Sequence, residues 1–271
     1  MTEEIIGAGQ RKIFNFKELW RYRELFYFFT WRDVKIKYKQ TVLGFLWAVL
    51  QPVLMMIIFT LFGRTLSIDS RGIPYELFVF SGLLIWSIFS TGLLGASNSI
   101  INNSLIIKKI YFPRLVIPVS SILVSLFDFL MAVILLVPML LWFKQPVHWN
   151  ALYLWPASIV LAVIATLGLG CWLAALNIKY RDFRYVIPFV IQVMFFVSSV
   201  IYPVSMITNP VLRNILAASP IYAAVELFRV PITGIWPDTS SLMISLGSGL
   251  FFLIFGLVYF RRLEEQFADL A

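Results

Sequence analysis

Long uncharged, mainly apolar runs recur along the chain. Five runs contain no Asp, Glu, Lys or Arg, and they cover residues 40–63, 77–107, 145–178, 185–212 and 239–260. A sixth run, residues 115–143, contains one charged residue, Asp128. About 20 apolar residues are enough for a helix to cross a bilayer, and a backbone in hydrocarbon must satisfy its own hydrogen bonds. The pattern therefore predicts an all-α polytopic membrane protein with six transmembrane helices.

Composition supports the membrane assignment and limits the number of domains. Of the 271 residues, 60% are hydrophobic and 13% are charged, whereas soluble domains have about 45–50% apolar and about 25% charged residues. We expect residues 1–40 to form a cytoplasmic N-terminal segment. Residues 41–271 are expected to form one six-span transmembrane domain.

The basic residues predict the orientation of the spans. On one side of the six-span pattern lie 17 of the 22 Lys and Arg residues: Arg11, Lys12, Lys17, Arg21, Arg23, Arg32, Lys35, Lys37, Lys39, Lys108, Lys109, Arg114, Lys179, Arg181, Arg184, Arg261 and Arg262. Loops on the cytoplasmic side of membrane proteins carry an excess of Lys and Arg. Both termini are therefore predicted to be cytoplasmic. The net charge of +8 reflects topology and lipid contact, and we predict no nucleic-acid partner.

The N-terminal segment contains an aromatic and basic stretch before the first span. Residues 16–31 place charged side chains on one helical face and aromatic side chains towards the other, which predicts an amphipathic helix at the membrane interface. A basic collar, residues 32–40, follows it. The collar fits attraction to anionic lipid, and it also fits a clamp on a phosphate or diphosphate headgroup. The two interpretations are compatible.

The stretch between the last two predicted spans, residues 203–237, differs from the rest of the chain. It contains five of the 13 prolines, and two short apolar pieces, residues 211–218 and 221–230, lie between them. Each piece is too short to span, so we predict two short re-entrant helices in the outer leaflet. Irregular backbone at that depth survives only against protein or a water-filled cavity, which suggests that this region borders a pathway.

Few side chains in this sequence offer catalytic chemistry. The chain has no GxxxxGK[ST] loop, and its residues suggest no metal site. Asp128 is the one acid within a span: it could couple transport to an ion, or be a structural residue capped by Ser125 or a neighbouring helix. Glu226 and Arg229 are three residues apart and can pair locally. The single histidine, His148, lies in a predicted outer loop and is the one plausible general base for a membrane enzyme.

Four stretches give the chain a family resemblance over nearly its full length. They are YKQTVLGFLWAVLQP at residues 38–52, IYFPRLVIP at 110–118, NIKYRDFRYVIPFVIQVMFFVSSVIYP at 177–203, and SPIYAAVELFRVPITG at 219–234. In order and spacing they resemble the type-two ABC exporter permeases that move polysaccharides and teichoic acids. The chain departs from the common pattern at Ser199, where the family often has Pro, and at Ser219, where it often has Asn.

The resemblance implies a transport subunit of the bacterial cytoplasmic membrane rather than an enzyme. Such permeases form homodimers and work with two copies of a separate ATPase subunit, so ATP and Mg would be bound by that partner and no cofactor by this chain. The implied substrate is an undecaprenyl-linked polysaccharide, either O-antigen or capsular polysaccharide, with teichoic acid as the alternative within the family. An ion-coupled carrier that uses Asp128 and a membrane enzyme acting on lipid-linked sugars remain the alternatives from other classes.

The resemblance also assigns candidate roles to particular residues. The lipid-linked headgroup would be admitted at Arg32, Lys35, Lys37 and Lys39. The channel lining, at a dimer seam around spans one and five, would include Phe45, Trp47, Phe195, Phe196 and Tyr202. The exit region would include Arg213, Glu226 and Arg229. A coupling helix within residues 103–113 would contact the ATPase through Asn103, Lys108, Lys109, Tyr111 and Phe112.

Overall fold

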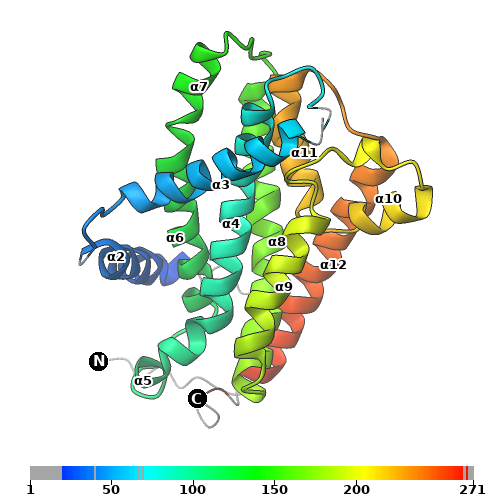
Figure 1. The fold of residues 1–271 in the computed structure, drawn as a ribbon. Coiled ribbons are helices and arrows are strands. Elements are labelled where there is room, and N and C mark those ends of the chain that lie inside the picture. Colours follow the sequence, from blue (N-terminus) through cyan, green and yellow to red (C-terminus); the bar gives the residue numbers. More distant parts are fainter. Residues whose placement is uncertain (1–19, 40, 66–67, 69, 265–266, 268–271) are drawn as a thin grey trace.

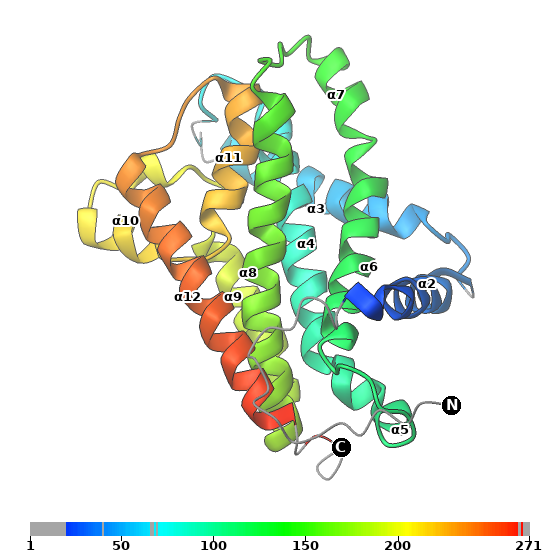
Figure 2. The ribbon, with the colours of Figure 1, turned by 180° about the vertical axis from the view of Figure 1, so that it is seen from behind.

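The protein is built from long helices that stand side by side. The computed structural model describes residues 20–39, 41–65, 68, 70–264 and 267, and the regular elements of these residues are helical. Five segments are long and apolar enough to cross a membrane: α3 (Leu46–Thr65), α4 (Tyr75–Asn102), α6 with α7 (Val116–Val133 and Leu136–Trp142), α8 (Ala151–Lys179) and α12 (Thr239–Leu263). Figures 1 and 2 show α4 and α8 next to each other, with α6 and α12 on either side. The predicted all-α polytopic fold is confirmed for the described residues.

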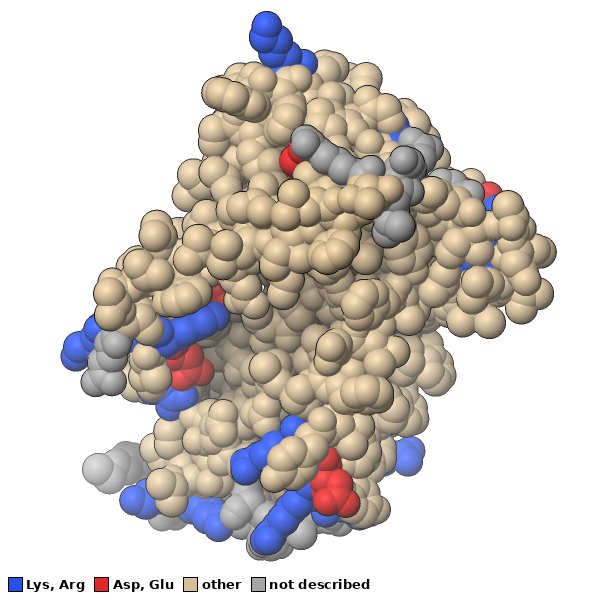
Figure 3. Space-filling view, in the orientation of Figure 1, with Lys and Arg blue, Asp and Glu red and all other residues tan. Residues whose placement is uncertain are grey.

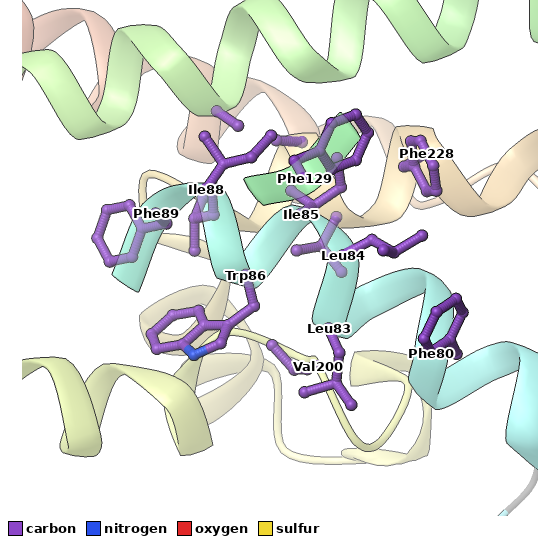
Figure 4. Close-up of a cluster of buried hydrophobic side chains, with 14 of the residues drawn as sticks. Phe80, Leu83, Leu84, Ile85, Trp86, Ile88, Phe89, Phe129, Val200 and Phe228 are labelled. Carbon is purple, nitrogen blue, oxygen red and sulfur yellow. The ribbon is translucent and has the colours of Figure 1, made fainter. Parts of the chain in front are cut away.

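Helix α4 is the centre of the core. It is the most buried candidate span, with 78% of its apolar window inside the protein, and it packs against both α6 and α8. Figure 4 shows Phe80, Ile85 and Phe89 of α4 among Phe129 of α6 and Phe228. A helix that is hydrophobic on all sides is expected to be surrounded by other elements.

The predicted fifth span is shorter than its uncharged run. Helix α9 covers only Phe183–Val197, 15 residues, whereas the uncharged run that predicted the fifth span covers residues 185–212. The chain leaves the helix at Ser198 and Ser199, and Ser199 has a φ of +59°, a conformation that ends a right-handed helix. Absence of charge predicted an apolar environment correctly, but it did not predict where the helix ends.

Two short helices follow α9, as predicted. Helix α10 (Pro210–Ala217) and α11 (Tyr222–Thr233) are bent by 97° relative to each other. Asn209 caps α10, because its Oδ1 accepts the backbone N–H of Val211 at 2.9 Å, and Pro210 occupies the first helical turn. The α10–α11 pair lies beside α12 in Figure 1.

The N-terminal helix differs from its prediction. Helix α2 covers Arg23–Lys39, so the predicted end at residue 31 is wrong, and the basic collar is the second half of this helix rather than a separate segment. The cause is tertiary packing: α2 buries Phe29, Val34 and Tyr38 and packs mainly against α6. Residues 16–19 of the predicted helix lie outside the described residues. In Figure 1, α2 lies above the level of α5 (Ser104–Ile107).

Helices α3 and α9 are the least covered apolar helices of the bundle. Only 17% of the apolar window of α3 is buried, and Ile187 is the one buried residue of α9. Figure 1 shows α3 inclined across α4 rather than parallel to it, with α9 in front of α8. One side of the bundle therefore presents two apolar helices that have few partners within the chain.

Candidate functional site

A cavity lies between α2, α3, α4, α6 and α9, on the side where α3 and α9 are exposed. Its volume is about 440 Å³. We call it the aromatic cavity, and its lining residues include Trp47, Gln51, Phe59, Trp86, Ser87, Ser90, Thr91, Gln192, Phe195 and Phe196. Aromatic and hydrogen-bonding side chains therefore line the same space. Such a surface suits a sugar chain, which has apolar C–H faces and polar hydroxyls.

The aromatic side chains of this cavity support one another. Phe195 lies with its ring centroid 5.4 Å from each of the rings of Phe59, Trp86 and Phe196. The Phe195–Phe196 pair is edge-to-face at 81°, an arrangement that the ring quadrupoles favour. These contacts join α3, α4 and α9 around the cavity.

A second cavity, of about 590 Å³, lies between α2, the end of α4 and α6. We call it the polar cavity, and its lining residues include Arg32, Asp33, Gly95, Ser99, Asn102, Asn103, Ser121 and Ser125. Lys37, Thr91 and Asp128 line both cavities, so the two meet at these residues. Figure 3 shows the surface hollowed beside the Lys and Arg residues of α2.

An ion pair occupies the junction of the two cavities. The Lys37 ammonium pairs with Oδ2 of Asp128, and the Tyr38 hydroxyl donates to Oδ1. Burial, and then the hydrogen bond to the Asp128 carboxylate, raise the pKa of Tyr38, so its phenol stays protonated and acts as the donor. Ser125 does not cap Asp128, because its hydroxyl donates to the Ile122 carbonyl at 2.7 Å. The structural interpretation of Asp128 offered two partners, Ser125 or a residue on a neighbouring helix. The structure shows the second, because Lys37 and Tyr38 of α2 hold the carboxylate.

Arg32 fixes the α2 helix to the end of α4. One Nη2 hydrogen bond reaches Oδ1 of Asn103 at 2.7 Å, and Nε donates to Asp33 at 2.8 Å. The other two predicted headgroup residues lie apart from the cavities: Lys35 contacts the Trp31 ring at 5.4 Å, and Lys39 lines neither cavity. The structure brings only Arg32 and Lys37 of the predicted set to a cavity.

The predicted channel residues divide in the same way. Trp47, Phe195 and Phe196 line the aromatic cavity. Phe45 instead packs on the Tyr38 ring at 4.7 Å, and the Tyr202 hydroxyl donates to the Phe196 carbonyl at 2.5 Å. Sequence reasoning did not assign Gln51 or Gln192 to the cavity, although a glutamine within an uncharged apolar run was a signal that could have been used.

The predicted exit residues lie in two different environments. Glu226 and Arg229 are completely buried in α11, at 0% exposure. The Arg229 guanidinium donates to the carbonyls of Ser199 at 2.7 Å, Val200 at 2.5 Å and Phe78 at 3.0 Å. These bonds satisfy the backbone where α9 has ended and tie it to α4 and α11. Glu226 and Arg229 therefore hold backbone segments together at this place, and their assignment to an exit region stays a prediction.

Glu226 completes this buried network. Its Oε2 lies 2.6 Å from Nη1 of Arg71, and its Oε1 lies 3.4 Å from Nη1 of Arg229 and accepts the Ser199 hydroxyl at 3.0 Å. The expected local Glu226–Arg229 pair is therefore present but is the longer of the two ion pairs. Arg213 lines a pocket of about 250 Å³ together with Trp236 and Asp238, and Arg71 links this pocket to the buried network because it lines the pocket as well.

The segment expected to couple to an ATPase contains only one short helical turn. Helix α5 is four residues long, and the rest of residues 103–113 is non-helical. Lys108, Lys109 and Tyr111 are exposed. Asn103 and Phe112 are buried, and Phe112 packs on Phe29 of α2 with ring centroids 5.7 Å apart. Phe112 therefore positions the segment and does not present its ring to a partner.

Sequence comparison finds relatives that cover nearly the whole chain. The O-antigen export system permease protein RfbA of Myxococcus xanthus is 28% identical over 256 residues, which cover 93% of this chain and 97% of that protein. A protein of the same name from Klebsiella pneumoniae is 28% identical over 243 residues, covering 88% and 92%. The polysialic acid transport protein KpsM of Escherichia coli is 24% identical over 247 residues, covering 86% and 91%.

The sequence profile of a transporter family covers most of the chain. The profile described as ABC-2 type transporter matches residues 24–233. This range includes α2, both cavities and the α10–α11 pair. The chain is a multi-pass membrane permease, a transport component rather than a catalytic one. It belongs to the ABC-2 type transporter family.

Proposed function

We propose that this protein is the membrane subunit of an ATP-driven exporter that moves an undecaprenyl-linked polysaccharide, O-antigen or capsular polysaccharide, across the bacterial cytoplasmic membrane. The observation that carries the proposal is the aromatic cavity, whose rings and hydroxyl and amide groups can contact a sugar chain without binding any one sugar tightly. The relatives named for O-antigen export and polysialic acid transport support this substrate class.

A second copy of the chain would complete the conduit. The aromatic cavity borders α3 and α9, whose exposed faces include Trp47, Met55, Phe189 and Phe196. Lipid could cover apolar helices, but a half-open cavity bordered by polar side chains would then face hydrocarbon, which is unfavourable. A homodimer across α3 and α9 would close two such cavities around one passage.

Loading would take place from the side of α2. The polar cavity brings Arg32 and Lys37 to its wall, and both are suited to phosphate oxygens. The lipid-linked headgroup would lie in the polar cavity while the attached sugars enter the aromatic cavity. The shared wall at Thr91 and Asp128 makes the two spaces continuous.

The energy would come from a separate ATPase, two copies for the dimer, which bind ATP and Mg. Figure 3 shows basic residues gathered at the lower end, where Lys108 and Lys109 follow α5. Contact there would transmit motion to α4 and α6, the two helices that α5 and its flanking loops connect. Both termini would lie on this cytoplasmic side.

The test is gentle purification of the tagged protein from native membranes, followed by identification of stoichiometric partners. We expect a phosphate-loop ATPase at one copy per permease, and loss of surface polysaccharide when either gene is deleted. A permease that purifies alone under several mild conditions, with transport that is indifferent to ATP, would overturn the proposal and favour an ion-coupled carrier.

A further inference from the structure

The ion pair at the junction of the cavities is placed where a substrate anion would pass. Asp128 and Lys37 line both the polar and the aromatic cavity. The side chain of Lys37 is 43% exposed, whereas that of Asp128 is 8% exposed. The lysine therefore faces the shared space, and the carboxylate lies behind it in the wall.

Both oxygens of the carboxylate are held by the same helix. Lys37 and Tyr38 are neighbours on α2, and each contacts a different oxygen of Asp128 on α6. The nearby acid Asp33 is already held by Arg32 at 2.7 Å. Asp128 is thus the anion that occupies Lys37 in the absence of substrate.

A phosphate group presents the same charged oxygens to a lysine as a carboxylate does. The lysine side chain is a flexible four-carbon stem with three donors, so its ammonium can exchange one acceptor for another. If Lys37 turned to a phosphate in the polar cavity, Asp128 would keep the Tyr38 hydrogen bond. The carboxylate would then be only partly unsatisfied, and the exchange would be reversible.

We propose, building on the proposed function, that Lys37 is an anion-exchange site for an isoprenoid diphosphate and that Asp128 is its built-in competitor. The diphosphate of the carrier lipid displaces Asp128 from Lys37 when the substrate is loaded, and Asp128 reclaims Lys37 when the substrate leaves. Substrate binds only the fraction of molecules in which Lys37 has been released, so the apparent affinity is lowered by that fraction.

This arrangement gives Asp128 a role in selectivity. The cytoplasmic leaflet of a membrane is rich in anionic phospholipids, and an unpaired lysine at that surface would bind them as well as the substrate. A competitor of one negative charge favours a ligand that carries more charge than a single phosphodiester. Asp128 is therefore a positioning residue that acts through Lys37 and discriminates diphosphates from singly charged headgroups.

The experiment measures binding of farnesyl diphosphate to the permease–ATPase complex in nanodiscs that contain phosphatidylglycerol. Asp128→Asn removes the competitor, and we expect binding about tenfold tighter than wild type, with reduced preference over the singly charged phosphatidylglycerol of the nanodisc. Lys37→Gln should weaken diphosphate binding on its own. Combined with Asp128→Asn, it should remove the tighter binding that Asp128→Asn produces. Glu24→Gln, an exposed change of equal charge on α2 away from both cavities, should match wild type.

A second variant, Tyr38→Phe, tests the competition between Asp128 and diphosphate and should change the binding affinity in the opposite direction. Tyr38→Phe removes the other partner of Asp128, so the carboxylate should hold Lys37 more strongly and weaken diphosphate binding severalfold. A merely structural Asp128 predicts weaker or unchanged binding in Asp128→Asn, and that result in a folded complex overturns the inference.

The outcomes separate this inference from the proposed function. Unchanged binding in Asp128→Asn, together with a loss in Lys37→Gln, removes the competitor and leaves the exporter proposal intact. Inorganic diphosphate that binds as tightly as the farnesyl compound also overturns the inference, because the site would then recognise a free anion. If neither the wild type nor any variant binds farnesyl diphosphate, the inference is overturned as well. Co-purification of the ATPase tests the exporter proposal independently.

Discussion

Among the described residues, two groups of ion pairs inside the helical bundle differ in their access to solvent. The Arg71–Glu226–Arg229 network is sealed at its centre: Glu226 and Arg229 are 0% exposed, and three backbone carbonyls accept hydrogen bonds from Arg229. Of its three members, Arg71 alone reaches a pocket, the small one beside Arg213. The Lys37–Asp128 pair lies in the wall of two cavities, and its lysine is 43% exposed. One network joins helix ends, and the other is open to a ligand.

The difference shows how the surroundings decide what a charge in a membrane bundle does. Removing one partner from a sealed pair leaves the other charge without water, whereas a group beside a cavity can be rehydrated or bound by a ligand. The sealed network should therefore control stability. The open pair should control binding with a smaller effect on stability.

Loss of Arg229 should give the largest effect on stability. Arg229→Met removes the donor to the carbonyls of Ser199 and Val200 and leaves Arg71 as the one cation paired with Glu226, so we expect about 3–5 kcal/mol of destabilisation. The measurement is the thermal unfolding midpoint in detergent together with the amount of protein in membranes. If Arg229→Met unfolds at the wild-type temperature, the sealed network is not what holds the end of α9.

Gly82 tests the same network from the side of α4. A Cβ at this position would overlap the Arg229 guanidinium and approach the Val200 carbonyl oxygen to 2.9 Å. Gly82→Ala should therefore cost about 1–3 kcal/mol through overpacking. Gly247→Ala on α12 is the matched control, since nothing lies within 4 Å of its added Cβ, and its unfolding midpoint should stay close to wild type. Equal midpoints for the two variants would argue against a close contact at Gly82.

Asp128 should matter less for stability than Arg229. Asp128→Asn keeps the shape of the side chain but removes its charge from Lys37, so we expect about 1.5–3 kcal/mol of destabilisation, the range typical of hydrogen bonds to charged groups. Transport should remain dependent on ATP hydrolysis. Export is measured as surface polysaccharide in cells whose own copy has been deleted. An ion-coupled carrier predicts loss of transport in Asp128→Asn at normal protein levels, which would contradict the exporter proposal.

The sequence predicted the helical content and most of the spans because charge is costly in hydrocarbon. It predicted the two short helices because prolines interrupt this apolar stretch. Pro231, which was expected to follow the second helix, lies inside α11 instead. It did not predict the end of α9 at Val197, because the Arg229 contacts that stabilise the unwound segment come from residues about 30 positions away. Such contacts do not appear in a local pattern.

The candidate sites were predicted in part, like the fold. Spacing and resemblance placed Trp47, Phe195 and Phe196 in the expected region, and all three line the aromatic cavity. The Lys37–Asp128 pair was not predicted, since 91 residues separate the partners. A basic collar read from sequence gives the charge of a segment but does not distinguish a lysine that faces a cavity from one that faces outward.

The smallest change in stability and export is expected for a substitution of Lys35, which lies on α2 like Lys37 but away from both cavities. The Lys35 ammonium lies over the Trp31 ring at 5.4 Å, and its side chain lines neither cavity. Lys35→Gln should change stability by no more than about 0.5 kcal/mol and leave export near wild type, because exposed substitutions away from special contacts are usually near-neutral. Lys37→Gln, two residues along the same helix with the same loss of charge, should strongly reduce export while the complex still assembles. If both variants reduced export equally, the basic collar would act through its total charge at the lipid surface, and the cavity-facing position of Lys37 would carry no special role.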